Sequence, residues 1–389
     1  MLYTLNKTTR SIPNFADSLK RAISGNILSH DEIVSLVQTG NKVEIEALHE
    51  AAGKRTKEIF GNEVSIRGIV EFSNHCEKSC HYCGVPTYDE KFLIPHESIL
   101  ECCDFMWEKG YRNVVLQSGE ITSESRMNWI SSLIRKVFDK FGNEKDKGMC
   151  IVLSIGELSF EQYKRFYDMG VQRYLLRVES SNPDLYHSMH PPDHLWSNRV
   201  DCLNNLKKIG YVAGTGCMIG VPKQTYDDVA SDIEFFRDGQ YPMIGLGPYI
   251  IHKDTVMGKK LLNSTSKSER DEADLLKTQI TLNVYNAIRL VSPLVNIAAT
   301  TALETLSPGS KAKALLGGAN VLMPIITPKV FRTGYQIYEG KKEVDMDRED
   351  THNRVLELMK EIGKVARFNK WNHPPLYEKL YPNYANRMK

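Results

Sequence analysis

Residues 64–84 read VSIRGIVEFSNHCEKSCHYCG, a run that joins a predicted strand to three closely spaced cysteines. β-Branched and apolar residues dominate its first half, which is typical of a buried strand. Cys76, Cys80 and Cys83 follow with the spacing C-x₃-C-x₂-C, so that three thiolates can hold three irons of a cubane iron–sulfur cluster. No fourth cysteine stands near them in the sequence, so the last iron would keep an open position for chemistry.

Two other interpretations of the three cysteines stay open. A structural zinc site usually adds a second knuckle of Cys or His ligands, and none follows here, although His75 and His81 could supply nitrogen. Buried free thiols are the second alternative. Disulfides suit small secreted scaffolds, and we find neither a secretory signal pattern nor a chain that short. The other cysteines lie in apolar runs and are predicted core residues: Cys102, Cys103, Cys150, Cys202 and Cys217.

The composition is that of an ordinary globular protein. Of 389 residues, 41% are hydrophobic and 25% are charged, and the formal net charge is +2. This charge gives no electrostatic argument for a nucleic-acid partner or an anionic membrane, and no apolar run is long enough to span a bilayer. Thiols that stay reduced predict a cytoplasmic, oxygen-poor setting. Residues 1–20 contain few acidic residues, so they are either an exposed arm or an organelle transit segment.

Apolar runs alternate with amphipathic helical stretches, which indicates β/α units and a parallel sheet. Eight strands are predicted, at 64–74, 113–120, 150–157, 173–180, 211–220, 243–250, 295–302 and 320–326. Helices are predicted at 98–109, 160–170, 197–210, 225–238 and 267–291. Eight units predict an α/β fold, a closed TIM-type (β/α)₈ barrel with its site at the carboxyl ends of the strands. An open barrel of six units is the alternative, because the last two strands have the weakest pattern.

The predicted barrel occupies residues 63–335. Residues 1–62 are expected to form a helical extension, with a helix cap at Ser29 to Glu32. Residues 336–389 are expected to form a helix over 349–368 and then an irregular tail rich in proline and aromatic residues. We expect this tail to pack against the barrel, with a partner-binding segment as the alternative.

Polar side chains stand where predicted strands end, although an inward-facing barrel strand should be apolar. Because the carboxyl ends of parallel strands share one mouth, we expect these side chains to lie together above the cysteine loop. They follow strands two, three, four, six and seven: Gln117, Ser118 and Glu120, with Gly119 between them; Ser154 and Glu157; Arg177 and Glu179; Tyr249 and His252; Thr300 and Thr301.

The cysteine loop, with aromatic Tyr82 before its third cysteine, resembles the signature of radical S-adenosylmethionine (SAM) enzymes. From about residue 60 to residue 340 the chain is similar to one branch of that superfamily, which contains biotin synthase, methylornithine synthase and the [FeFe]-hydrogenase maturase HydE. The similarity is strongest to HydE. It rests on the runs EFSN (71–74), VLQSGE (115–120), RYLLR (173–177), NR (198–199), GVPKQT (220–225), GLGP (245–248), ATTA (299–302), GAN (318–320) and MP (323–324).

The resemblance implies a [4Fe–4S] cluster on the three cysteines and SAM on its open iron. It implies SAM contacts from Tyr82, Ser118, Gly119, Glu120, Glu179, Arg199, Met218 and Val221, with Arg199 on the SAM carboxylate and Glu179 on the ribose. It also implies an inner cavity for an anionic substrate, lined by Arg177, Thr300, Thr301, Glu304 and Phe331. Two purely structural alternatives stay open. Arg199 is then an arginine on the surface of a helix, and Arg177 forms a buried ion pair with Glu157 or Glu179.

The function implied is reductive cleavage of SAM to a 5′-deoxyadenosyl radical, in maturation of the [FeFe]-hydrogenase H-cluster. The implied partners are a small or organometallic substrate, an electron donor such as flavodoxin or ferredoxin, and other hydrogenase maturases. A radical SAM mutase or sulfur-chemistry enzyme acting on a small amino-acid-derived substrate is the first alternative. An iron–sulfur carrier without turnover is the alternative from another class. Val178, Glu304 and Phe331 depart from the HydE pattern, which leaves the substrate open.

Overall fold

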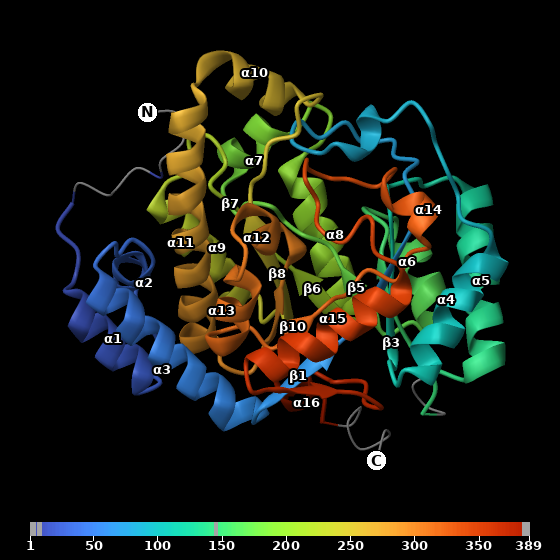
Figure 1. Ribbon diagram of the computed structural model, residues 1–389, viewed down its shortest axis with the longest axis horizontal. Helices are drawn as coiled ribbons and strands as arrows, with labels where there is room; N and C mark the ends of the chain where they lie inside the picture. Colours follow the sequence, from blue (N-terminus) through green and yellow to red (C-terminus); the bar gives the residue numbers. More distant parts are fainter. Residues whose placement is uncertain (1–4, 6–9, 144–146, 383–389) are drawn as a thin grey trace.

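The computed structural model describes residues 5, 10–143 and 147–382. Three helices precede the sheet: α1 (Phe15–Ile23), α2 (His30–Val37) and α3 (Lys42–Phe60). The predicted cap at the start of α2 is confirmed, because Ser29 and Glu32 form a capping box. α2 packs on α9 (Tyr226–Asp238) and α3 packs along α11 (Lys267–Val291), so this helical extension covers one side of the barrel (Figure 1).

All paired strands of the main sheet run parallel, and the sheet curls into a TIM-type barrel. The first predicted strand is two segments, β1 (Glu63–Ile66) and β2 (Gly68–Ser73), separated by Arg67. β1 pairs with β10, β2 pairs with β3, and Ile69 bridges to Ile325. The consecutive strands β1 and β2 therefore connect β10, on one side, to β3, on the other. This arrangement confirms the predicted fold class. The other strands are β3 (Asn113–Ser118), β4 (Cys150–Ser154), β5 (Arg173–Leu175), β6 (Val212–Thr215), β7 (Met218–Ile219), β8 (Met243–Pro248), β9 (Asn296–Ala299) and β10 (Val321–Leu322).

Helices surround the sheet in the order that β/α units require (Figure 1). α11 has the bounds predicted from the sequence, and the ends of the other predicted helices move by one or two residues. The remaining helices are α4 (His96–Glu108), α5 (Glu124–Phe141), α6 (Phe160–Asp168), α7 (Pro183–Met189), α8 (Trp196–Ile209), α10 (Val256–Ser264), α12 (Thr301–Leu306), α13 (Ser310–Leu316), α14 (Lys329–Arg332), α15 (Arg348–Glu361) and α16 (Pro375–Leu380). None of these helices, within the ranges given, is long and apolar enough to cross a bilayer.

All eight predicted strands end earlier than expected, and two of them change their course beside the mouth. The strand predicted over 173–180 is regular only in β5, and the strand predicted over 211–220 divides into β6 and β7. Gly216 lies at the division, where a Cβ atom would come within 1.7 Å of the Gly245 carbonyl oxygen. The chain stays beside β8 through this close approach, since β7 pairs with β8 in the same register as β6. On the other side, the Leu176 and Glu179 N–H groups donate to the carbonyl oxygens of Gly214 and Gly216, which holds residues 176–180 at the barrel mouth.

The prediction of a helix over 349–368 is wrong for the second half of this range. α15 ends at Glu361, and Gly363 with a φ of 65° turns the chain into β11 (Val365–Arg367), which pairs with β1. The tail then packs under the barrel: Arg173 donates to the Trp371 carbonyl oxygen at 2.7 Å. The predicted packing of the tail is thus confirmed as far as residue 382, and residues 383–389 lie outside the described part.

Candidate active site

The interior of the barrel changes from apolar to polar within one layer. Ile69, Val115 and Val152 lie in register on β2, β3 and β4 and belong to one apolar cluster. The side chains two residues further along lie in register as well, and they are polar: Glu71, Gln117 and Ser154. Since side chains alternate across a strand, this second row also faces inward, toward the mouth.

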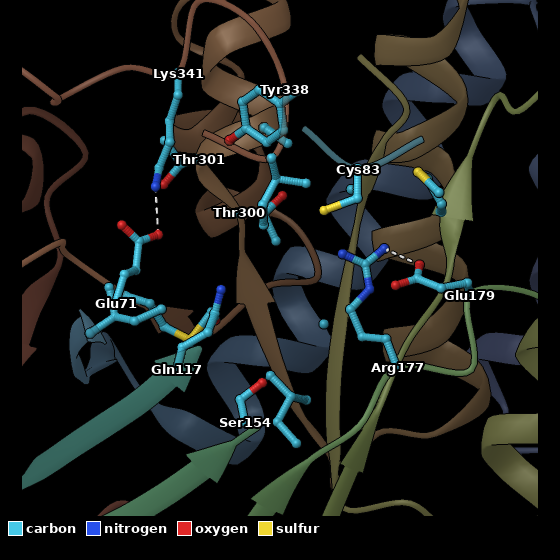
Figure 2. Close-up of a pocket in the computed structure, with 18 of the residues that line it drawn as sticks. Glu71, Cys83, Gln117, Ser154, Arg177, Glu179, Thr300, Thr301, Tyr338 and Lys341 are labelled. Carbon is cyan, nitrogen blue, oxygen red and sulfur yellow. Dashed lines mark hydrogen bonds and ion pairs between the residues drawn. The ribbon is translucent and has the colours of Figure 1, made fainter. Parts of the chain in front are cut away.

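A cavity of about 320 Å³ opens above this polar row. Figure 2 shows two charged pairs on opposite sides of it, with two threonines between them: Arg177 with Glu179, Glu71 with Lys341, and Thr300 with Thr301. The lining also includes most of the expected SAM contacts: Tyr82, Ser118, Glu179, Arg199 and Met218. The structure therefore brings together residues that are far apart in the sequence.

The cysteine loop joins β2 to the cavity and is held against the end of β3. Cys83 lines the cavity. The Glu120 backbone N–H donates to Cys76 Sγ at 3.3 Å, and the Glu77 N–H donates to the Glu120 carbonyl oxygen at 2.8 Å. At Gly119 an added Cβ would lie 2.6 Å from the Cβ of Cys76, so only glycine permits this contact. Sequence positions 118–120 and the cysteine loop thus form one structural unit.

The three cysteines fit an iron–sulfur cluster. Burial raises the pKa of Cys76, of Cys80 to about 12, and of Cys83, so each thiol stays neutral unless cations are close to it. Iron ions would supply that charge, and the Glu120 N–H would then stabilise a thiolate on Cys76. Among the residues that the structure describes, no group of three or more His, Cys, Asp or Glu side chains is placed closely enough to hold one single metal ion. The other five cysteines are buried, as predicted.

Arg199 stands at the centre of a charge network that borders the cavity. It lies on α8 and is only 8% exposed, so the surface-arginine alternative is wrong. Its Nε donates to Glu157 at 2.6 Å, and Lys78 Nζ lies 3.1 Å from Glu157 and 3.3 Å from Glu120. Burial opposes ionisation of Glu157, but Arg199 and Lys78 outweigh it and lower the pKa of that carboxyl. Burial and the Glu157 charge raise the pKa of Glu120.

Glu179 has a strained backbone that the neighbouring strand holds in place. Its φ is 66°, in the left-handed region that few residues other than glycine adopt. Its N–H donates to the Gly216 carbonyl oxygen at 3.0 Å, and its own carbonyl oxygen accepts from the Met218 N–H at 3.1 Å. The carboxylate pairs with Arg177 at 2.9 Å, so one of the two alternatives for Arg177 is observed. Strain of this kind is frequent at functional sites, because the conformation aims a side chain.

Some expected site residues lie outside the cavity. Val221 is buried in the apolar cluster that contains Met218 and against which Tyr82 packs. Glu304 accepts hydrogen bonds from two backbone N–H groups near the start of α13, at 3.0 Å each, and faces a different cavity. The Phe331 ring packs on Phe92, with 5.2 Å between the ring centroids. The prediction that Glu304 and Phe331 line the substrate cavity is therefore wrong.

The structure adds cavity residues that the sequence did not indicate: Glu71, Tyr335, Tyr338 and Lys341. A glutamate at an inward position of an apolar strand was a detectable signal for Glu71. No pattern marked Tyr338 and Lys341, since both follow the predicted barrel boundary at residue 335. The residues after that boundary complete the wall of the cavity.

Gly156→Ala should weaken SAM binding about tenfold or more, because the new methyl group displaces a carboxylate that the resemblance assigns to the SAM amino group. Gly156 has a φ of 93°, and an added Cβ would lie 2.2 Å from Glu120 Oε2. Equilibrium dialysis of SAM against reconstituted, unreduced protein measures the effect. Gly25→Ala is the matched control, since Gly25 has a φ of 76° and nothing within 4 Å of the added Cβ. Equal SAM affinity in the two variants would contradict this role of Glu120.

Comparisons with known proteins identify the family of this chain. The family model for the radical SAM superfamily matches residues 70–236. The [FeFe] hydrogenase maturase subunit HydE of Thermotoga maritima is 36% identical over 299 residues, which are 76% of this chain and 80% of that protein. The 3-methylornithine synthase of Methanosarcina barkeri is 23% identical over 350 residues, which are 89% of this chain and 92% of that protein.

A solved structure has the same fold. The crystal structure of methylornithine synthase superposes with a TM-score of 0.73 at 19% identity, over 90% of this chain and 98% of that one. Together, the cysteine loop, the barrel and the extent of the match to HydE lead to one conclusion. The chain belongs to the radical SAM superfamily, and it is an enzyme of the kind that uses a [4Fe–4S] cluster and SAM.

Proposed function

We propose that this radical SAM enzyme acts in the maturation of an [FeFe]-hydrogenase. The observation that carries the proposal is the match to HydE, at 36% identity over 80% of that maturase. The radical SAM family model, which matches residues 70–236, includes the cysteine loop. The substrate in this proposal is a small organometallic molecule, an iron–cysteine precursor with carbonyl and cyanide ligands, and the reductant is a flavodoxin or a ferredoxin.

In this proposal Cys76, Cys80 and Cys83 hold the cluster. When bound, the cluster and SAM supply a 5′-deoxyadenosyl radical. Arg199 holds the SAM carboxylate, and Glu179 accepts hydrogen bonds from the ribose hydroxyl groups. The SAM amino group lies by Ser118, Gly119 and Glu120. The adenine lies by Tyr82 and Met218, and Val221 supports these two side chains from the apolar cluster. The closed barrel excludes water and stray hydrogen donors from the reacting atoms.

The substrate lies deeper, between the two charged sides of the cavity. Arg177 Nη2 donates to the Cys217 carbonyl oxygen at 2.7 Å and pairs with Glu179, while its Nε has no partner among the described residues. Burial opposes the charge of Arg177, but Glu179 outweighs it and raises the pKa of the guanidinium. The positively charged guanidinium thus lines the cavity together with Thr300 and Thr301, where it can attract an anionic substrate group.

A mutase that rearranges a small amino-acid-derived substrate is the second candidate. It is favoured by the likeness to 3-methylornithine synthase, which extends over 350 residues, against 299 for HydE. The identity is lower, at 23%. For this reason we rank the hydrogenase role first.

The two candidates are separated by a maturation assay. An unmatured [FeFe]-hydrogenase is incubated anaerobically with the other maturases, SAM and reductant, with and without this protein, and hydrogen evolution is measured. We expect activity only when the protein is present, and none when its Cys80→Ala variant replaces it. An inactive hydrogenase, while the protein still cleaves SAM, would refute the hydrogenase role and favour the mutase.

A further inference from the structure

Glu71 and Lys341 form a buried ion pair in the wall of the cavity, opposite Arg177 and Glu179 (Figure 2). Glu71 is 3% exposed and Lys341 is 6% exposed. The two residues are 270 positions apart in the sequence: Glu71 lies on β2, and Lys341 follows α14. A buried pair of this kind is weak evidence for stability, because removing two charges from water costs about as much as their attraction returns. Its position in the cavity wall suggests a role toward the substrate.

The backbone fixes the direction of the Glu71 side chain. Its N–H donates to Thr327 Oγ1 at 2.8 Å, and the register between β2 and β3 shifts just after it, between Glu71 and Ser73. Such irregularities re-aim side chains at the rims of barrels. The amide of the neighbouring Gln117 donates to the Tyr335 hydroxyl at 3.3 Å.

The two oxygens of Glu71 differ. Oε1 accepts from Lys341 Nζ, which also donates to the Tyr335 carbonyl oxygen at 2.9 Å. Oε2 is buried and has no hydrogen-bond partner within the described residues. A buried carboxylate oxygen without a donor is costly, because it has lost its water without gaining a hydrogen bond. A carboxylate and a guanidinium thus line the cavity from its two sides, and each has one buried polar atom without a partner in the described residues: Glu71 Oε2 and Arg177 Nε.

We propose that the Glu71 carboxylate, which lines the cavity, binds a protonated amine of the substrate, with Lys341 as the positioning residue that holds the carboxylate. The substrate is then a zwitterion, with its cationic group at Glu71 and its anionic group at Arg177. An anion at the Glu71 side would meet the carboxylate at close range, and Lys341 already has two acceptors. This inference rests on the proposed function only in taking the cavity as the substrate site.

The test measures the binding of two probes of one shape to reconstituted protein, with saturating SAM and no reductant. S-Methyl-L-cysteine carries an amine and a carboxylate, and 3-(methylthio)propanoate lacks only the amine. Calorimetry should show that the wild-type protein prefers the amine probe by about tenfold or more, as expected for a charge-assisted hydrogen bond. In Glu71→Gln the preference should fall to about twofold or less, while the propanoate affinity is unchanged.

Two further variants keep the result interpretable. Glu71→Gln leaves Lys341 buried without its counter-charge, so the double variant Glu71→Gln, Lys341→Met restores neutrality and should lose the preference equally. Glu343→Gln is the matched control, because Glu343 pairs with Lys311 at 3.0 Å outside this cavity, and it should keep the preference.

Three results would overturn the proposal. The first is a wild-type protein that binds the two probes equally well. The second is a Glu71→Gln variant that keeps the preference for the amine probe. The third is a Glu71→Gln variant in which both probes bind more weakly by the same factor. Since no SAM is cleaved in this experiment, its failure is distinguishable from a failed maturation assay.

Discussion

Cys80→Ala protein, reconstituted with iron and sulfide under anaerobic conditions, will release no 5′-deoxyadenosine above background from SAM and dithionite. Two thiolates remain in the variant, and two cannot hold the three irons that a cubane cluster with one open position requires. A water molecule is a poor replacement for the missing thiolate as an iron ligand. The contacts of the cysteine loop with Glu120 at the end of β3 also restrict how far the loop can move to bring another ligand to the iron. Chromatography of the products and the iron content of the protein measure the two effects.

The matched control is Cys103→Ala. Cys103 is a fully buried cysteine of α4, so the chemical change is the same and only its place differs. This variant should keep its iron and its 5′-deoxyadenosine release, with a small loss of stability. Comparable release from Cys80→Ala and from the wild type would refute the assignment of the cluster to this loop.

Arg199→Met should weaken SAM binding about a hundredfold, the second large effect. The acidic groups beside the SAM site are Glu120, Glu157 and Glu179, and the basic groups are Lys78, Arg177 and Arg199. These charges balance, so removal of one arginine leaves an excess negative charge where the SAM carboxylate should bind. Arg199→Lys should recover only part of the affinity, since lysine keeps the charge but not the planar pair of donors.

Equilibrium dialysis with two ligands separates binding of the carboxylate from general damage to the fold. SAM carries the carboxylate, and 5′-methylthioadenosine keeps the nucleoside but lacks the amino-acid part. We expect Arg199→Met to lose SAM affinity and to bind 5′-methylthioadenosine nearly as well as the wild type. Arg165→Met is the control, because Arg165 forms its ion pair with Glu124 on the outer helices. An equal loss for both ligands would contradict the carboxylate role.

The barrel and the cluster loop were predictable from the sequence because both depend on local patterns. Strand and helix periods repeat along the chain, and Cys76, Cys80 and Cys83 lie within one loop. The breaks in the strands were not predictable. Glu179 leaves the ladder with a φ of 66°, held by contacts to Gly216 and Met218 that no local pattern encodes.

The errors in the substrate side of the cavity have a common physical cause. A residue type at a given position says little about where its side chain points. Glu304 turns back to the backbone at the start of α13, and Phe331 packs on Phe92. Conversely, Lys341 reaches Glu71 across 270 residues of sequence, and no spacing rule connects them.

The most direct test of the account is a crystal structure of the reconstituted protein with SAM, with anomalous data collected at the iron and zinc absorption edges. The account predicts an iron signal on Cys76, Cys80 and Cys83, with the SAM carboxylate at Arg199 and the ribose at Glu179. A zinc signal on the three cysteines, or SAM bound away from the cavity of Figure 2, would contradict it.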